Sequence, residues 1–192
     1  MCEKVKIKGY SSLFITTMRG NRVNYLKIIA LMVLFLGGNH CFSQDYQFHK
    51  VYIYNFTKYI QWPPEMQGGD FVIGVYGKSS MINELKAMSL NRTVGAQKIT
   101  VKEIHSPQDA STCHVVFVPS GKSGSLTDLK SKLDGRPTLI ITEKDGLAKQ
   151  GSAINFVLVD GKLKYELNKN SIDKAGLKVM PDLVKLAILI NT

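Results

Sequence analysis

Cysteine is scarce in this chain of 192 residues, which holds three cysteines, one tryptophan and six prolines. Cys2 and Cys41 lie among the first 43 residues, so Cys113 is the single cysteine of the remainder. One cysteine cannot form an internal disulfide, which excludes a disulfide-stabilised scaffold. Low-complexity tracts and internal repeats are also absent, and 44% of the residues are hydrophobic. This composition is typical of one globular domain and excludes a disordered or fibrous chain.

The chain also lacks the spacings that mark common catalytic and metal sites. His-x-x-x-His, Cys-x-x-Cys and Gly-x-Ser-x-Gly do not occur. Gly121-Lys122-Ser123 resembles part of a phosphate-binding loop, but the position that needs the first glycine of that loop holds Val116. We therefore expect no enzyme, no metal and no cofactor. A weaker use of this loop stays open, because backbone N–H groups at the start of a helix can hold an anion.

Acidic residues are few, since 15 Asp and Glu stand against 25 Lys and Arg and give a formal net charge of +10. Residues 1–43 hold six basic residues and one acidic residue, so they contribute +5 of this charge. Beyond residue 43 the lysines alternate with acids, and no basic stripe with stacking aromatics occurs. The charge therefore does not indicate a nucleic-acid partner.

Long hydrophobic runs are missing as well. The run at residues 28–36 spans nine residues, about half of the ~20 that a membrane-crossing helix needs. Arg19, Arg22 and Lys27 precede it, and Gly37-Gly38 and a polar stretch follow it. This order is typical of a secretory signal peptide.

We place the cleavage site after Ser43, because Cys41 and Ser43 are small residues at the −3 and −1 positions. The sequence thus predicts a signal peptide over residues 1–43 and an α/β domain over residues 44–192. Met18 is an alternative start that would give a signal of ordinary length. An uncleaved anchor and a lipid on Cys41 are the alternatives to cleavage after Ser43.

The first element of the predicted mature chain is a helix from about Tyr46 to Ile60, with Asp45 as its N-cap. It ends before Trp62-Pro63-Pro64, because proline disfavours a helical residue before it. Three- and four-residue spacings predict its buried face. That face comprises Phe48, Val51, Tyr52, Asn55, Phe56 and Tyr59.

Strands and helices then alternate. Apolar runs predict buried strands at 71–76, 114–118 and 137–142, a further strand at 97–104, and helices after Ser79 or Ser80, at 126–133 and at 169–175. Asp160-Gly161 predicts a hairpin between 153–159 and 162–167. A last helix is predicted from Pro181, with Leu183, Val184, Leu186, Ala187 and Ile190 buried. The fold class is therefore α/β, a single three-layer domain with a mostly parallel sheet flanked by helices and a C-terminal β-hairpin.

Aromatic residues are concentrated at the start of the predicted mature chain, with seven between residues 46 and 62. Core packing with tyrosines at its rim is one interpretation, and a surface for a partner or small ligand is the other. We take Tyr54, Tyr59 and Trp62 as the candidate partner or dimer surface, with Asn55 bonding backbone groups beneath them. Cys113 is either a small buried hydrophobe or a redox-reactive or intermolecular thiol, and we expect it to be inert.

Six blocks of the chain resemble the YfiR/HmsC family of bacterial periplasmic proteins and occur in the order found in that family. They are Tyr54-Asn55-Phe56-Thr57-Lys58-Tyr59 with Trp62-Pro63, and the segments 71–77, 113–118, 139–142, 151–156 and 175–179. The resemblance implies a non-enzymatic periplasmic regulator that binds the sensor domain of an inner-membrane diguanylate cyclase and represses the enzyme. Release of that enzyme would raise cyclic di-GMP and promote biofilm formation.

The resemblance also implies homodimers whose activity responds to the redox state of the envelope through cysteines. Cys113 stands at the strand cysteine of the family, but segment 71–76 holds no cysteine and the later cysteine pair is absent. Internal disulfide switching is therefore not available to this chain. The expected partner is a membrane-bound signalling protein, either a diguanylate cyclase or a sensor kinase. The alternative is an exported small-ligand-binding module, with its site where strand order reverses at the carboxyl ends of parallel strands.

Overall fold

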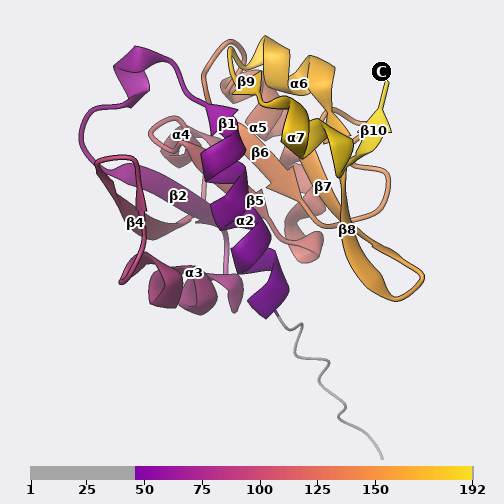
Figure 1. Cartoon of the computed structure of the whole chain (residues 1–192), viewed down its shortest axis with the longest axis horizontal. Coiled ribbons are helices and arrows are strands. Elements are labelled where there is room, and N and C mark those ends of the chain that lie inside the picture. The colour runs from indigo at the N-terminus through magenta and orange to yellow at the C-terminus, as the bar shows by residue number, and fades with distance from the viewer. Residues whose placement is uncertain (1–45, 192) are drawn as a thin grey trace, which may run out of the picture. The chain divides into compact units, whose positions relative to one another are not determined.

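An eight-stranded sheet runs through the centre of the computed structural model, which describes residues 46–191 (Figure 1). The predicted signal peptide and its cleavage site lie outside the described residues. The strand order is β10-β8-β7-β6-β5-β2-β4-β3. Neighbouring strands are parallel from β4 to β7 and between β8 and β10, and antiparallel in the pairs β7·β8 and β3·β4. The strands are β2 (Phe71–Tyr76), β3 (Thr93–Val94), β4 (Gln97–Ile104), β5 (Val115–Val118), β6 (Leu139–Thr142), β7 (Ile154–Val159), β8 (Lys162–Asn168) and β10 (Ile188–Ile190).

Helices cover both faces of this sheet. The main ones are α2 (Gln47–Tyr59), α3 (Met81–Ser89), α4 (Pro107–Ala110), α5 (Leu126–Lys132), α6 (Lys169–Lys174) and α7 (Pro181–Lys185). Two 3₁₀ turns, η1 (Pro64–Met66) and η2 (Ser120–Ser125), and a small antiparallel pair, β1 (Ile60–Gln61) with β9 (Lys178–Val179), complete the described part of the chain. The predicted α/β fold with a mostly parallel sheet and a C-terminal hairpin is confirmed.

Strand β5 shows why there are three layers. Its side chains are buried on both faces, because Val115 and Phe117 pack in one hydrophobic cluster and Val116 and Val118 in another. The first cluster includes residues of α2, α3, α6 and α7, and the second includes residues of α4 and α5. Burial of a side chain such as Val or Phe contributes about 1.5–3 kcal/mol, so both layers of helices are needed to stabilise this strand.

The predicted hairpin joins β7 to β8 through Asp160 and Gly161. Both residues have positive φ, 53° and 70°, as a type I′ turn requires. A buried polar network holds the base of the hairpin to β6. The Thr142 hydroxyl donates to Oδ1 of Asn155 at 2.7 Å, and Nδ2 of Asn155 donates to Glu166 at 2.9 Å. The hairpin is thus fixed relative to the parallel part of the sheet.

The predicted buried face of α2 is wrong for most of its residues. The buried residues are His49, Ile53, Phe56 and Thr57, whereas Phe48 is 69% exposed and Val51 is 53% exposed. At 100° per residue, positions 49, 53, 56 and 57 occupy the arc beside the predicted one. The helix is therefore rotated about its axis relative to the expectation, and most of the stripe read as core faces outward.

The predicted last helix is also partly wrong. Helix α7 ends at Lys185, and β10 follows it as an edge strand that pairs in parallel with β8, Ile188 opposite Glu166 and Ile190 opposite Asn168. Leu186, expected to be buried, is 76% exposed. A short apolar run is compatible with either a helix or a strand, and here pairing with the open edge of β8 determines the strand.

Candidate functional site

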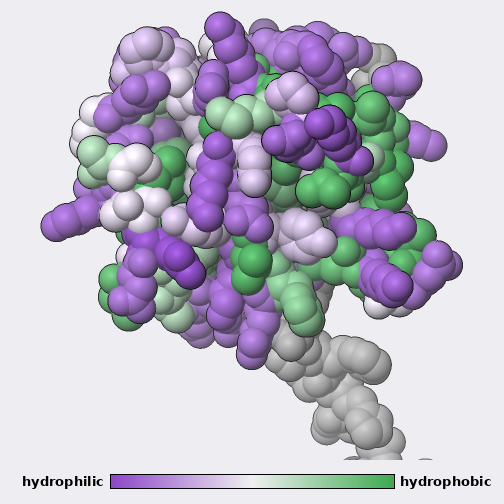
Figure 2. Space-filling model, viewed as in Figure 1, coloured by the Kyte–Doolittle hydropathy of each residue, from purple (hydrophilic) through white to green (hydrophobic). Residues whose placement is uncertain are grey.

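The most extensive uncovered apolar feature of α2 is the α2 stripe, which we define as Phe48, Val51, Tyr52, Asn55 and Tyr59. These positions lie within one arc of the helix at 100° per residue. Phe48, Val51 and Tyr59 are exposed, while Tyr52 and Asn55 are half-buried. In Figure 2 hydrophobic side chains lie over the lower part of α2 and toward the β7–β8 hairpin, among hydrophilic ones. Exposed apolar side chains in such a row are typical of a protein-binding surface.

The α2 stripe continues into a groove beside the β7–β8 hairpin. Phe48 and Tyr52 form one wall of this groove, and Leu158 and Leu163 form the other. Its volume is about 400 Å³. Leu158 is 74% exposed, and the Tyr52 hydroxyl donates to the backbone oxygen of Leu163 at 3.3 Å. Sequence reasoning missed Phe48, Val51 and Leu158 as surface residues, although an apolar arc too wide for one buried face was a signal for the first two.

Tyr54 and Tyr59, two residues of the expected partner surface, lie at different positions around α2. Tyr59 is 37% exposed and belongs to the α2 stripe. Tyr54 is half-buried on another arc, where Nζ of Lys58 lies 4.5 Å and Cζ of Arg92 lies 5.2 Å from its ring centre. Its hydroxyl donates to the backbone oxygen of Thr93 at 3.4 Å. The structure therefore does not bring the two tyrosines together in one patch.

Trp62, the third residue of that expected surface, lies in the hydrophobic core and is 7% exposed. Its ring meets the ring of Phe71 edge to face at 5.0 Å, and its indole N–H donates to the backbone oxygen of His114 at 3.3 Å. The indole contacts the chain's own core, so Trp62 is not available to a partner in this structure. Of the three residues of the expected surface, Tyr59 lies on the α2 stripe, Tyr54 lies on another arc of α2 and Trp62 lies in the core.

Cys113 is fully buried and is a free thiol. This burial agrees with the interpretation of Cys113 as a small buried hydrophobe. Burial raises the pKa of the thiol, and the backbone oxygen of Asp109 lies 3.6 Å from its sulfur. Gly74 of β2 lies opposite, since a Cβ added there would lie 2.8 Å from the sulfur of Cys113. The thiol therefore lacks both the access and the low pKa of a reactive cysteine.

His114, the neighbour of Cys113, holds a defined hydrogen-bonded position. Its Nδ1 accepts a hydrogen bond from the Val72 N–H at 3.0 Å, and its Nε2 lies 2.7 Å from the backbone oxygen of Met66. Only the neutral tautomer with its proton on Nε2 satisfies both contacts. The ring stacks on Phe71 with centres 4.5 Å apart, and burial lowers the pKa of His114. These contacts make His114 a structural residue that links η1 to the sheet.

Strand order reverses between β2 and β5, which is where a ligand site was expected under the small-ligand alternative. A Cβ added to Gly77, just after β2, would lie 2.8 Å from Cε of Lys122, so the stem of this lysine covers Gly77. Glu143, just after β6, accepts hydrogen bonds from the Tyr46 hydroxyl and the Ser120 N–H, both at 2.9 Å. Side chains of the chain itself therefore cover much of this edge.

Among residues 46–191, no three His, Cys, Asp or Glu side chains come together in a way that could hold a metal ion. None of the helices found there has the length and apolar character needed to cross a membrane.

No curated protein matches the chain. A family model described as YfiR/HmsC-like matches residues 46–188, which include α2 with its stripe and the hairpin that lines the groove. The chain therefore belongs to the YfiR/HmsC-like family, whose members are non-catalytic periplasmic regulators of cyclic di-GMP signalling.

Proposed function

We propose that this protein binds and represses the periplasmic sensor domain of an inner-membrane signalling enzyme, a diguanylate cyclase. Family membership over residues 46–188 carries the regulatory part of this proposal. The α2 stripe supports the binding part, because Phe48, Val51 and Tyr59 are exposed on one side of a helix whose other side is in the core. Aromatic and aliphatic side chains in such a position are the usual anchors of protein–protein interfaces.

The composition of the α2 stripe favours a protein partner. The stripe holds no charged residue, and the groove beside it is lined mainly by Phe48, Tyr52, Leu158 and Leu163, with Lys162 as its charged residue. An apolar centre with charges confined to its border is the arrangement of a specific protein interface. We infer that the sensor domain contacts the stripe and inserts an apolar side chain into the groove.

The test measures cyclic di-GMP in cells of the source bacterium that lack this protein. Loss of the protein should raise cyclic di-GMP, and production of the wild-type chain should restore the original level. Val51→Asp should fail to restore it, because a charge at the centre of an apolar interface weakens binding by about tenfold or more. The matched control is Leu90→Asp, since Leu90 is 82% exposed at the end of α3, outside the stripe.

Stability measurements separate binding from folding in this test. Both substitutions lie at exposed positions, so each should change the free energy of unfolding by no more than about 0.5 kcal/mol. Unchanged cyclic di-GMP on loss of the protein would overturn the proposed function. Equal restoration by Val51→Asp and Leu90→Asp would overturn the proposed surface. Light scattering on the purified variants determines whether a second copy of the chain occupies the stripe instead.

A further inference from the structure

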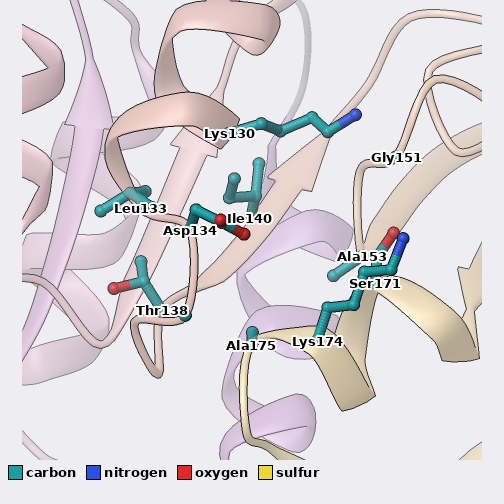
Figure 3. A pocket seen from close by; sticks show the side chains of 11 residues that line it. Lys130, Leu133, Asp134, Thr138, Ile140, Gly151, Ala153, Ser171, Lys174 and Ala175 are labelled. Carbon is teal, nitrogen blue, oxygen red and sulfur yellow. The ribbon is translucent and has the colours of Figure 1, made fainter.

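A small hollow lies between the end of α5 and helix α6, at the amino-terminal ends of β6 and β7 (Figure 3). Its volume is about 90 Å³. The buried side chains of Leu133, Ile140 and Ala153 form an apolar floor. Three charged side chains, Lys130, Asp134 and Lys174, stand at its border and are exposed. An apolar floor with a few converging polar groups is the usual form of a small-molecule site.

The three charges around the hollow do not neutralise one another. In the part of the chain that the structure describes, neither Asp134 nor Lys174 forms an ion pair within 4.0 Å, although ion pairs occur elsewhere on the same surface. Lys130 lies four residues before Asp134, yet its Nζ donates to the backbone oxygen of Gln150 at 2.6 Å instead. Figure 3 shows Asp134 on the α5 side of the hollow and Lys174 with Ser171 on the α6 side. Two cationic groups and one anionic group are thus available to a ligand.

Lys130 is held in place by the backbone that it crosses. Gly151 has a φ of 99°, and a Cβ added there would lie 2.7 Å from Cε of Lys130. The stem of the lysine therefore rests against a residue without a side chain. The Lys130 ammonium donates one N–H group to a neutral carbonyl and has further N–H groups for a second acceptor. A group fixed before binding lowers the entropic cost of binding.

Asp134 has no evident role in stabilising the helix that it follows. It comes just after the C-terminal end of α5, where the helix dipole presents partial negative charge. A carboxylate at that end is electrostatically unfavourable for the helix, and within residues 46–191 no ion pair of Asp134 offsets this. A ligand with a positively charged group would compensate for it.

From this arrangement we infer that the hollow binds a small zwitterion, an α-amino acid with a short aliphatic side chain. The ligand carboxylate lies with the ammonium groups of Lys130 and Lys174, and the ligand ammonium lies with Asp134. The short side chain faces Leu133, Ile140 and Ala153. A volume of about 90 Å³ corresponds to a few water molecules, which matches one small organic molecule and excludes a nucleotide.

Calorimetric titration of the purified protein tests this inference with two probes of similar size, L-alanine and propionate. L-alanine should bind saturably, and propionate, which lacks the ammonium, should bind about tenfold more weakly. Asp134→Asn should weaken L-alanine binding by about tenfold and leave propionate binding unchanged. Lys174→Gln should weaken the binding of both probes. Asp128→Asn is the matched control, because Asp128 is an exposed aspartate of α5, the helix that precedes Asp134, and does not line the hollow.

Three results would overturn the inference. They are absence of L-alanine binding at millimolar concentration, equal affinity for L-alanine and propionate, and L-alanine binding that Asp134→Asn and Lys174→Gln do not change. Thermal unfolding of each variant without ligand shows whether it is folded. The measurement involves no partner protein, so its outcome is independent of the cyclic di-GMP test of the proposed function.

Discussion

His114 has both ring nitrogens engaged by backbone groups that require a neutral ring. Protonation of Nδ1 would place a second donor against the Val72 N–H, which already donates to that atom at 3.0 Å. The backbone oxygen of Met66 is bound to the other ring nitrogen, so the ring connects β2 to η1. A positive charge on His114 would therefore break the hydrogen bond from the Val72 N–H of β2, although Nε2 could still donate to Met66.

We expect acid to destabilise the protein through His114. Its pKa is lowered in the folded state by burial, so below about pH 6.5 the unfolded chain takes up a proton that the folded chain does not. Stability is therefore present above about pH 6.5 and falls with pH down to the folded-state pKa. Each unit of lowering removes about 1.4 kcal/mol. Urea unfolding followed by circular dichroism at pH 8, 6.5 and 5 measures this loss.

Two variants separate His114 from the other titrating groups. His114→Asn keeps an acceptor for Val72 and loses the contact with Met66, so it should cost about 1 kcal/mol at pH 8 but show a flatter pH dependence. His105→Asn is the control, because the His105 side chain is 70% exposed. An unchanged pH dependence in His114→Asn would contradict the assignment.

Gly74 and Cys113 form the second residue-scale pair, because the glycine leaves the space that the sulfur fills. Gly74→Ala should destabilise the protein by about 1–3 kcal/mol, since the new methyl group would lie 2.8 Å from the sulfur and 3.1 Å from Cδ1 of Ile104. The double variant Gly74→Ala with Cys113→Ala should recover most of this loss. Urea unfolding of the four proteins gives the coupling free energy. If the losses in the free energy of unfolding simply add in the double variant, the clash with the sulfur is not what destabilises Gly74→Ala.

At the scale of elements, the strands were more predictable than the orientation of the first helix. Segments 71–76 and 97–104 were predicted with the bounds that β2 and β4 have. Segment 71–76 is short, holds β-branched residues and is followed by Gly77, and segment 97–104 partly alternates, so both patterns favour a strand over a helix. Helix α2 is apolar over two neighbouring arcs, and spacing alone does not decide which arc faces the sheet. Which arc of α2 faces the sheet depends on the side chains of the sheet. The ring of Phe56 packs against the rings of Phe156 and Tyr165.

The residues of the candidate site were only partly predictable. Aromatic density in segment 46–62 left core packing and a binding surface as alternatives, and of the three residues chosen for the surface Tyr59 lies on the exposed α2 stripe. Trp62 was misplaced because the sequence does not show that the segment after α2 folds back over β2 and β5. The hollow beside α6 was not foreseen, since its charged residues come from two segments about 40 residues apart, α5 with its end and α6, which the pairing of β6 with β7 and of β7 with β8 brings together.

At the scale of the whole molecule, the net charge of +10 gives little information on the partner. The described domain carries mixed charges, with Lys50 bound to Glu84 and Lys169 to Asp173. Surface pairs of this kind contribute about 0–1 kcal/mol and serve solubility more than stability. The basic excess of residues 1–43 fits export.

Export gives a prediction for the intact protein. If the signal peptide is cleaved after Ser43, the protein recovered from the periplasm should begin at Gln44 and carry a formal charge of +5. Intact-mass spectrometry of that protein measures the N-terminus to one residue. A mass that includes Cys41 would contradict cleavage after Ser43, and an added acyl mass on Cys41 would identify the lipid alternative.

The position of Trp62 also makes the protein its own optical reporter. Trp62 is the single tryptophan of the chain, and its indole lies edge-on to Phe71 with its N–H bound to the backbone of His114. Fluorescence excited at the red edge of the indole absorption therefore comes from Trp62 alone. It reports on the contact between the segment after α2 and the central strands, which we call the seam. A shift of that emission without loss of far-ultraviolet ellipticity would reveal opening of this seam while the sheet stays intact.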